Sequence, residues 1–181
     1  HLVRWLVQEA GANVDQGRLD DGGTPLYQAA VNNHLDVLKW LILEGGAQVD
    51  KTTHASCGSF SVLHAAAFHG QETIVRWLLT HCCGDGALDI DGMAPKHGVT
   101  PLHTAAMEGH HEVCYCLCCH GADPETRTRN PNVEETAADV AARHKFNKLA
   151  AWLRMWEKLS GRPPLERALR VAAERRDPEA A

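Results

Sequence analysis

Cysteine and histidine are the residues of this 181-residue sequence whose types and spacing could do chemistry. Cys116 and Cys119 have the C-x-x-C spacing common among metal ligands, and Cys82 and Cys83 are adjacent in the chain. Thiolate sulfur and imidazole nitrogen are the ligands that zinc prefers, so one hypothesis for this cluster is a zinc site. Redox sensing by Cys82 or Cys83 is a second hypothesis. Because no second C-x-x-C completes a zinc site, we expect no bound metal and no cofactor.

The number of cysteines also indicates the redox compartment. Seven is odd, and the cysteines are clustered, which makes a poor disulfide framework. Reduced thiols in a cytoplasmic or nuclear compartment fit better. No apolar run approaches the length of a membrane span, and no signal peptide stands at the start. Since the chain begins at His1 without a methionine, we expect it to be a fragment of a longer protein.

The sequence carries none of the common catalytic motifs. It contains no His-Glu-x-x-His, no Gly-x-Ser-x-Gly and no glycine-rich phosphate loop. The formal net charge is −5, and no segment has the concentrated positive charge that nucleic acid or an anionic membrane usually demands. We therefore predict that the chain is not an enzyme, has no catalytic residue or small-molecule substrate, and binds neither nucleic acid nor membrane.

These side chains must be positioned by an element that the chain repeats. Four similar stretches recur every 36 to 39 residues. They are Thr24–Ala30 (TPLYQAA), Ser61–Ala67 (SVLHAAA), Thr100–Ala106 (TPLHTAA) and Thr136–Ala142 (TAADVAA). A unit of this size cannot bury its apolar face alone and must stack on copies of itself. The pattern predicts a solenoid, which presents a long surface rather than a catalytic cleft.

One repeat shows the local logic. Thr100 is a good N-cap and Pro101 fits the first helical position. Gly109 can end this first helix because glycine tolerates a positive φ. A second helix follows, with Val113, Cys114, Leu117 and Cys118 at core spacing, and Gly121-Ala122-Asp123 ends it. The repeat is thus predicted to be a pair of antiparallel helices followed by an extended turn.

The sequence resembles the ankyrin-repeat family. The Thr-Pro-Leu-His-x-Ala-Ala signature is complete at Thr100–Ala106 and nearly so at Thr24–Ala30. Turns of the Gly-Ala-Asp type begin at Gly11, Gly46 and Gly121. The resemblance implies an all-α repeat solenoid, in which antiparallel helix pairs are joined by projecting β-turn fingers. It also implies a protein-binding role, and a hydrogen-bonding role for His64 and His103 in linking repeats.

The repeats divide the chain into an ankyrin-repeat domain at 1–160 and a remainder at 161–181. The domain would hold a half repeat at 1–15 and repeats at about 19–50, 56–91, 95–127 and 131–160. Longer fingers are expected at 52–59 and 91–98, and the last repeat lacks the proline and histidine of the signature, as a degenerate or capping unit would. Two alternatives remain for 161–181, which are a linker with the start of a further repeat and a solvated tail helix.

Two further sets of residues have structural explanations. Trp5, Trp40, Trp77, Cys116 and Trp152 occupy one position of the second helices. We expect this column to pack between neighbouring helices rather than to bind a ligand. His81 and His120 also occupy equivalent positions and should be neighbours. Most histidines at the ends of the first helices should be exposed; these are His34, His69, His110, His111 and His144.

The binding surface implied by the resemblance is the finger tips and the exposed face of the first helices. Two exposed positions follow the double alanine of each repeat, and charged finger residues flank them. The candidate protein-binding residues are Val31, Asn32, Phe68, His69, Met107, Glu108, Arg143 and His144, with Asp20, Asp21, Lys96 and His97 on the fingers. Val31, Phe68 and Met107 form an apolar column that would span about 20 Å. The alternative is that this column only packs against the adjacent fingers.

Three functions follow from the sequence. The first is a non-catalytic protein–protein interaction scaffold whose partner is another protein. The second is a regulatory or substrate-targeting module of a larger enzyme, such as a ubiquitin ligase adaptor or a kinase. The third and weaker function is the zinc or redox-sensing cysteine cluster described above.

Overall fold

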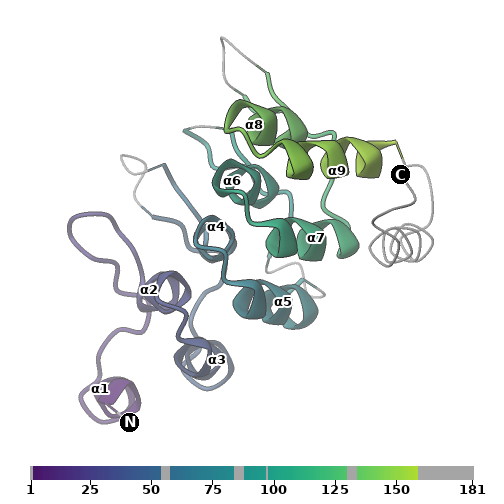
Figure 1. Cartoon of the computed structure of the whole chain (residues 1–181). Coiled ribbons are helices and arrows are strands. Elements are labelled where there is room, and N and C mark those ends of the chain that lie inside the picture. The colour runs from purple at the N-terminus through teal and green to yellow at the C-terminus, as the bar shows by residue number, and fades with distance from the viewer. Residues whose placement is uncertain (1, 54–57, 84–87, 97, 130–133, 159–181) are drawn as a thin grey trace.

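The computed structural model describes residues 2–53, 58–83, 88–96, 98–129 and 134–158. The helices in these ranges are α1 (Leu2–Gln8), α2 (Pro25–Val31), α3 (Leu35–Leu43), α4 (Val62–Phe68), α5 (Glu72–His81), α6 (Pro101–Glu108), α7 (His111–Cys119), α8 (Ala137–Arg143) and α9 (Asn147–Glu157). The fold class predicted from the sequence is confirmed, because the described chain is a helical repeat array (Figure 1). His97 and residues 161–181, predicted to be either a linker with the start of a further repeat or a tail helix, lie outside the described residues.

The first helices all begin at a hydroxyl cap. Thr24, Ser61, Thr100 and Thr136 have extended backbones, and each side-chain oxygen accepts a hydrogen bond from the amide three residues on. Such a bond satisfies one of the amides that a helix start leaves unpaired. Each first helix therefore starts at the same position of its repeat. As a result, equivalent side chains of neighbouring first helices align in columns.

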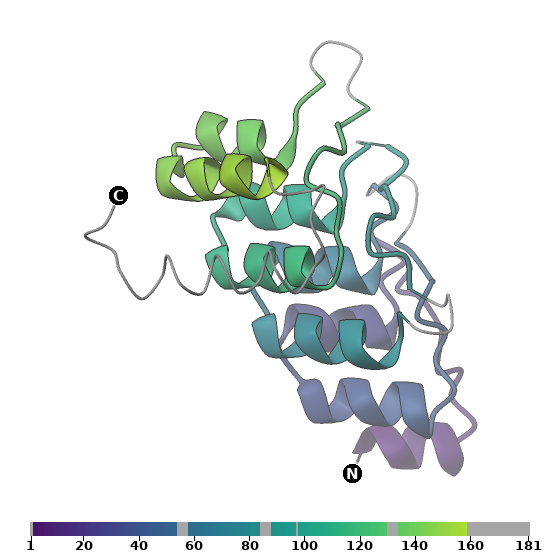
Figure 2. The ribbon, with the colours of Figure 1, turned by 90° about the vertical axis from the view of Figure 1, so that its right-hand side faces the viewer.

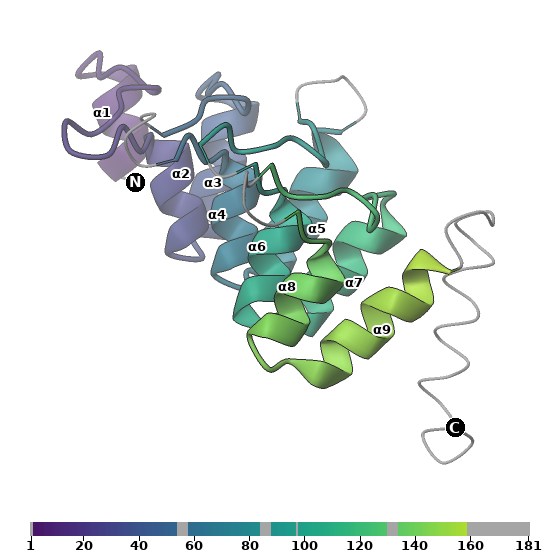
Figure 3. The same cartoon turned by 90° about the horizontal axis from the view of Figure 1, so that it is seen from above.

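The helices form two rows that run the length of the array. The first helices α2, α4, α6 and α8 lie side by side in one row, and the second helices α3, α5, α7 and α9 lie in the other (Figures 1 and 2). The alanine pairs of the first helices are buried; Ala30, Ala66 and Ala106 are all fully inaccessible. Small side chains at these positions let neighbouring helix backbones approach closely. Figure 3 shows the array from above, with the helices following one another from α1 at the upper left to α9 at the lower right.

Buried histidines connect one repeat to the next. The Nδ1 atoms of His64 and His103 accept from the backbone amides of Ser61 and Thr100, at 3.4 Å and 3.3 Å. An amide can only donate, so Nδ1 carries no proton and Nε2 must be the protonated nitrogen. His64 Nε2 lies 3.0 Å from the carbonyl oxygen of Val99, to which it donates. The resemblance-based role of these histidines in linking repeats therefore agrees with the structure.

The last repeat uses a different residue at this position. Asp139 stands where the other repeats have histidine, and its Oδ2 accepts from the amide of Thr136 at 3.3 Å. Its other carboxylate oxygen accepts from Arg154 at 3.3 Å. Burial alone would raise the pKa of Asp139, but the hydrogen bonds from Thr136 and Arg154 outweigh it and lower the pKa. The N-terminal cap of α8 is therefore the same as in the other repeats. In place of a hydrogen bond to a following repeat, Asp139 makes an ion pair with Arg154 of its own repeat.

The fingers are hairpin turns closed at their stems. Thr53 donates to the carbonyl of Phe60, and Ala94 donates to the carbonyl of Val99 in an isolated antiparallel bridge. A third stem closes where Thr128 donates to the carbonyl of Glu135. The first two stems belong to the long fingers expected from the sequence. These stems bring the residues just before each N-cap onto the first-helix side of the array.

The tryptophan column of the second helices packs in the array, with one exception. Trp40 is 4% exposed and donates from Nε1 to Glu44 Oε2 at 2.8 Å, and Cys116 is 3% exposed. Trp77 and Trp152 are half-buried against the core. Trp5 departs from the expectation, because it is 56% exposed on α1.

Candidate functional site

A groove of about 610 Å³ crosses the first-helix side of the array. Its floor is built from positions that repeat on α4, α6 and α8. Ala65 and Phe68, Thr104 and Met107, and Val140 and Arg143 all line it. Each of these pairs is spaced by three residues, which places both members on the same face of a helix. Because the first helices all begin at the same kind of cap, equivalent residues of successive repeats line up and form one continuous surface.

The apolar members of the groove are only partly covered. Phe68 is 39% exposed, and Met107 is half-buried. The other carbon-rich lining residues are Tyr27, Phe60, Ala65, Val99 and Val140. Phe68 meets the ring of His69 edge-on, with centroids 5.2 Å apart. Because more than a third of the Phe68 side chain faces solvent, packing against a finger does not account for the whole of this residue.

The wall on the finger side carries most of the groove's charge. Lys96 and Arg129 are exposed lining residues on two successive fingers. The two fingers are hydrogen-bonded to each other, since the amide of Arg129 donates to the carbonyl of Gly98 at 3.2 Å. A β-carbon on Gly98 would lie 2.4 Å from the backbone of Arg129, so only glycine permits this approach. The backbone of Arg129 is therefore held against Gly98, two residues from Lys96 in the chain.

An ion pair lies at the α8 end of the groove. Arg143 Nε lies 3.0 Å from Glu135 Oε1 and 3.2 Å from Oε2. Glu135 also accepts through its backbone carbonyl from His103 Nε2, at 3.1 Å. Glu135 is consequently fixed at both its backbone and its carboxylate. Glu135 is the one carboxylate among the lining residues that the structure describes.

Burial holds the two histidines under the groove in the neutral state. Burial lowers the pKa of His64 to about 4, against a smaller raising effect of its bond to Val99. Burial also lowers the pKa of His103, opposed by the bond to Glu135. Both Nε2 hydrogens are already used in the links between repeats. These histidines therefore shape the groove rather than offer a proton to a ligand.

Five of the residues predicted from the sequence line the groove together. They are Phe68, His69, Lys96, Met107 and Arg143. Val31 is half-buried, and Asn32, Glu108 and His144 are exposed, but none of these four is among the lining residues. On α2 the groove is reached by Tyr27 instead of Val31. His97 cannot be placed because it lies outside the described residues.

The acidic finger residues lie apart from the groove and are partly neutralised. Asp20 binds Arg18 through two nitrogen–oxygen contacts, and Asp21 Oδ1 lies 3.8 Å from Arg18 Nε. Along the sequence, the finger residues run from acidic at Asp20 and Asp21 to basic at Arg127 and Arg129. The pairing with Arg18 weakens the acidic end of that gradient.

Sequence reasoning missed several lining residues that a regular rule identifies. Thr104 and Val140 stand three residues before Met107 and Arg143, so helical periodicity alone could have found them. Phe60, Val99 and Glu135 each precede an N-cap residue. Their placement depends on the finger stems, which the helical pattern does not reveal.

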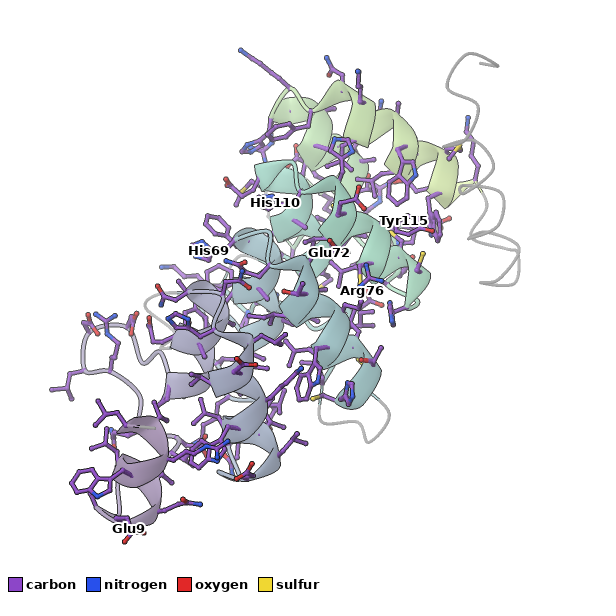
Figure 4. All side chains as sticks on the ribbon, turned by 60° about the horizontal axis from the view of Figure 1, so that its bottom comes forward. Glu9, His69, Glu72, Arg76, His110 and Tyr115 are labelled. Carbon is purple, nitrogen blue, oxygen red and sulfur yellow. The ribbon has the colours of Figure 1, made fainter. Side chains whose placement is uncertain are left out.

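One histidine expected to be solvated is instead a structural link. His110 Nε2 lies 2.9 Å from the carbonyl oxygen of Phe68, in the preceding repeat. Figure 4 shows His110 and His69 at the loops that follow neighbouring first helices. Gln71 Nε2 makes the corresponding bond to the carbonyl of Val31, at 3.3 Å. Of the five histidines expected to be exposed, the other four are exposed; they are His34, His69, His111 and His144.

The cysteines do not assemble into a metal site within the described part of the chain. No group of three or more metal-binding side chains comes together there. His81 and His120 each turn back on their own helix, bonding the carbonyls of Trp77 at 3.0 Å and Cys116 at 2.8 Å. Burial raises the pKa of Cys116 to about 11 and also raises that of Cys83. High pKa values disfavour the thiolate that both zinc binding and redox sensing require.

The fold and the groove define a class, a helical repeat module for protein–protein interaction. Within this class the chain belongs to the ankyrin-repeat family, since the family model "Ankyrin repeats (3 copies)" matches residues 1–53, 46–128 and 63–163. In the part of the chain that the structure describes, no helix is long and apolar enough to cross a membrane.

Two curated relatives share part of this sequence. The chain is 31% identical over 113 residues to the SMC5-SMC6 complex localization factor protein 1 of Bos taurus, and 30% identical over 113 residues to the protein of the same name from Homo sapiens. Each match covers 62% of this chain and 10% of the relative. The chain thus corresponds to about a tenth of the length of these proteins.

Proposed function

We propose that this module captures a partner protein in the groove formed by α4, α6 and α8. The observation that carries the proposal is the pairing of Phe68 and Met107 on adjacent helices, both part-exposed and both lining one groove. Aromatic and flexible apolar side chains supply much of the binding free energy at protein interfaces. A partly exposed pair of this kind is a suitable anchor point for an incoming side chain.

The dimensions support an extended segment or one face of a helix as the bound element. Packed helices lie about 8–10 Å apart, so three successive first helices offer about 20 Å of groove. The finger stems supply a second wall along this length. The catalytic machinery of an enzyme is not needed for such a function, and the role is that of a scaffold.

The test is a comparison of partner capture by three versions of the chain. The double variant Phe68→Glu, Met107→Glu places carboxylates in the groove, and we expect it to lose partners that the wild type retains. Leu43→Glu is the matched control, because Leu43 is a 68% exposed apolar residue on α3 that does not line the groove. Quantitative mass spectrometry of affinity-captured proteins, with circular dichroism of each variant, gives the result. An identical partner list for all three versions would contradict the groove as the binding site.

A second candidate function is that of a targeting module within a larger protein. The two relatives are named as localization factors of the SMC5-SMC6 complex, and the matched segment is a tenth of their length. By analogy, the repeat module would bring a larger chain to a multiprotein complex. The direct test is biolayer interferometry of this chain against purified SMC5–SMC6 complex. Saturable binding that the groove double variant loses would support targeting, and no binding would remove this particular complex as the partner.

A reducing compartment, cytoplasmic or nuclear, is the environment that we propose for this function. Six cysteines in the described part of the chain are free thiols; they are Cys82, Cys83, Cys114, Cys116, Cys118 and Cys119. Free, largely buried thiols are typical of proteins kept in the reducing interior of the cell. Imaging of the tagged full-length protein tests the location.

A further inference from the structure

The groove has a charge opposite to that of the chain around it. The chain carries a formal net charge of −5. The lining residues that the structure describes, in contrast, include the cations Lys96, Arg129 and Arg143 and one carboxylate, that of Glu135. The two buried histidines beneath it are neutral for the reasons given above. A basic site on an acidic chain favours an acidic ligand and repels a basic one.

The two arginines of the groove differ in whether they already bind a carboxylate. Arg143 holds both oxygens of the Glu135 carboxylate, so this pair is close to neutral as a unit. Arg129 has no carboxylate within ion-pair distance among the residues that the structure describes. Lys96 stands on the neighbouring finger, two residues before the Gly98 carbonyl that binds Arg129. Among the described lining residues, Arg129 is therefore a cation of the finger wall whose charge no ion pair offsets.

The apolar and positive parts of the groove lie on different elements. Phe68 and Met107 come from the ends of α4 and α6, whereas Lys96 and Arg129 come from the fingers that precede α6 and α8. A ligand that satisfies both parts must place an apolar side chain over the helices and negative charge toward the fingers. Arginine is well suited to this task, because its planar guanidinium binds carboxylates with two hydrogen bonds.

We infer that the groove recognises a linear peptide segment in which an aromatic or long aliphatic side chain is flanked by aspartate or glutamate. The inference rests on the proposed function and names the chemistry of its partner. The apolar residue binds between Phe68 and Met107, and the flanking carboxylates face Lys96 and Arg129. Recognition of this kind depends on a short sequence pattern of the partner rather than on its fold.

Selection from a phage-displayed library of random linear peptides tests the inference. The wild-type chain is panned beside a charge-reversed variant, Lys96→Glu with Arg129→Glu, and the groove variant Phe68→Glu, Met107→Glu. Leu43→Glu again serves as the control. We expect peptides selected on the wild type to be enriched in Asp and Glu around one apolar residue. The charge-reversed variant should select Lys and Arg in their place, and the control should select the wild-type pattern.

Affinity measurements on the selected peptides complete the test. Fluorescence anisotropy should show at least tenfold weaker binding of acidic peptides to the charge-reversed variant, and a fall in affinity as salt rises from about 0.05 M to about 0.5 M. Peptides that require Phe68 and Met107 but show no acidic enrichment would overturn the inference and leave the proposed function standing. A failure to select any peptide whose binding depends on the groove residues would count against both.

Discussion

His103 donates from Nε2 to the carbonyl oxygen of Glu135 across 3.1 Å, and the carboxylate of the same Glu135 binds Arg143. One buried histidine thereby fixes the position of a groove residue in the next repeat. His64 does the same for Val99, at 3.0 Å. The signature histidines of this chain are structural, but they determine where two residues of the groove wall stand.

Acid should destabilise the array through His64 once the pH falls below about 6.5. The pKa of His64 is lowered from 6.5 to about 4 in the folded state. Between these two values the unfolded chain binds a proton that the folded chain does not, so stability falls as pH decreases. Above about pH 6.5 the contribution is constant. The loss at pH 5 should be about 2 kcal/mol for His64 alone.

Urea unfolding at several pH values checks this expectation. The variant His64→Gln cannot titrate, and its stability should depend less on pH between 5 and 6.5 than that of the wild type. The Asp139 carboxylate affects stability in a separate, lower pH range. The stabilisation that comes from its lowered pKa is lost only as the pH falls below the ordinary aspartate pKa near 4. Equal slopes for the wild type and His64→Gln between pH 5 and 6.5 would contradict the assignment.

Gly109 should tolerate alanine less well than Gly46 does. Both have a positive φ, of 75° and 71°, so alanine strains the backbone at either position by about 1 kcal/mol. At Gly109 the new β-carbon would also lie 2.5 Å from the ring of Phe146, whereas at Gly46 nothing lies within 4 Å. We expect Gly109→Ala to cost about 1 kcal/mol more than Gly46→Ala. Chemical denaturation of the two variants measures the difference, and equal costs would show that the ring moves aside freely.

Local sequence patterns were sufficient to predict the helices of this protein. Thr100, Pro101 and Gly109 mark the start and end of α6, and the structure has the cap, the first-turn proline and the left-handed glycine at these positions. The column of Phe68, Met107 and Arg143 also followed from the repeat, because an identical helix in each repeat places equivalent residues side by side. The family assignment drew on the same regularity.

The contacts between the fingers could not be predicted in this way, although Lys96 was itself a predicted residue. A backbone bond from Arg129 to Gly98 joins the fingers that carry Arg129 and Lys96. The fingers differ in length from repeat to repeat, so this contact has no periodic signal. The bond from His110 to Phe68 was also missed, because an exposed loop histidine and a bridging one have the same sequence context. Contacts between non-identical loops depend on the three-dimensional path of the chain rather than on periodicity.

The cysteines should react with alkylating reagents in the order of their burial. Cys114 is fully inaccessible and burial raises the pKa of its thiol, so its reaction in the native state should be slower than in the unfolded chain by orders of magnitude. Among the six cysteines that the structure describes, Cys83 and Cys119 are half-buried and should react first. Iodoacetamide labelling followed by peptide mass spectrometry measures these rates. Rapid native labelling of Cys83 at neutral pH, faster than in the unfolded chain, would revive the redox hypothesis.

Glu135 should weaken the binding of acidic ligands while adding little to stability. Its ion pair with Arg143 joins a 56% exposed arginine to an 18% exposed glutamate. Pairs at the surface contribute about 0–1 kcal/mol, so Glu135→Gln should lower the free energy of unfolding by no more than this amount. The same change removes the one carboxylate from the described lining of the groove and releases Arg143 for a ligand.

We therefore expect Glu135→Gln to bind acidic groove peptides several-fold more tightly than the wild type at low ionic strength. The difference should shrink as salt screens the charges. Isothermal titration calorimetry with one acidic peptide and its Asn/Gln counterpart measures both effects. The neutral peptide is the control, and its affinity should change little. An equal gain for both peptides would mean that Glu135 acts through the shape of the groove rather than through its charge.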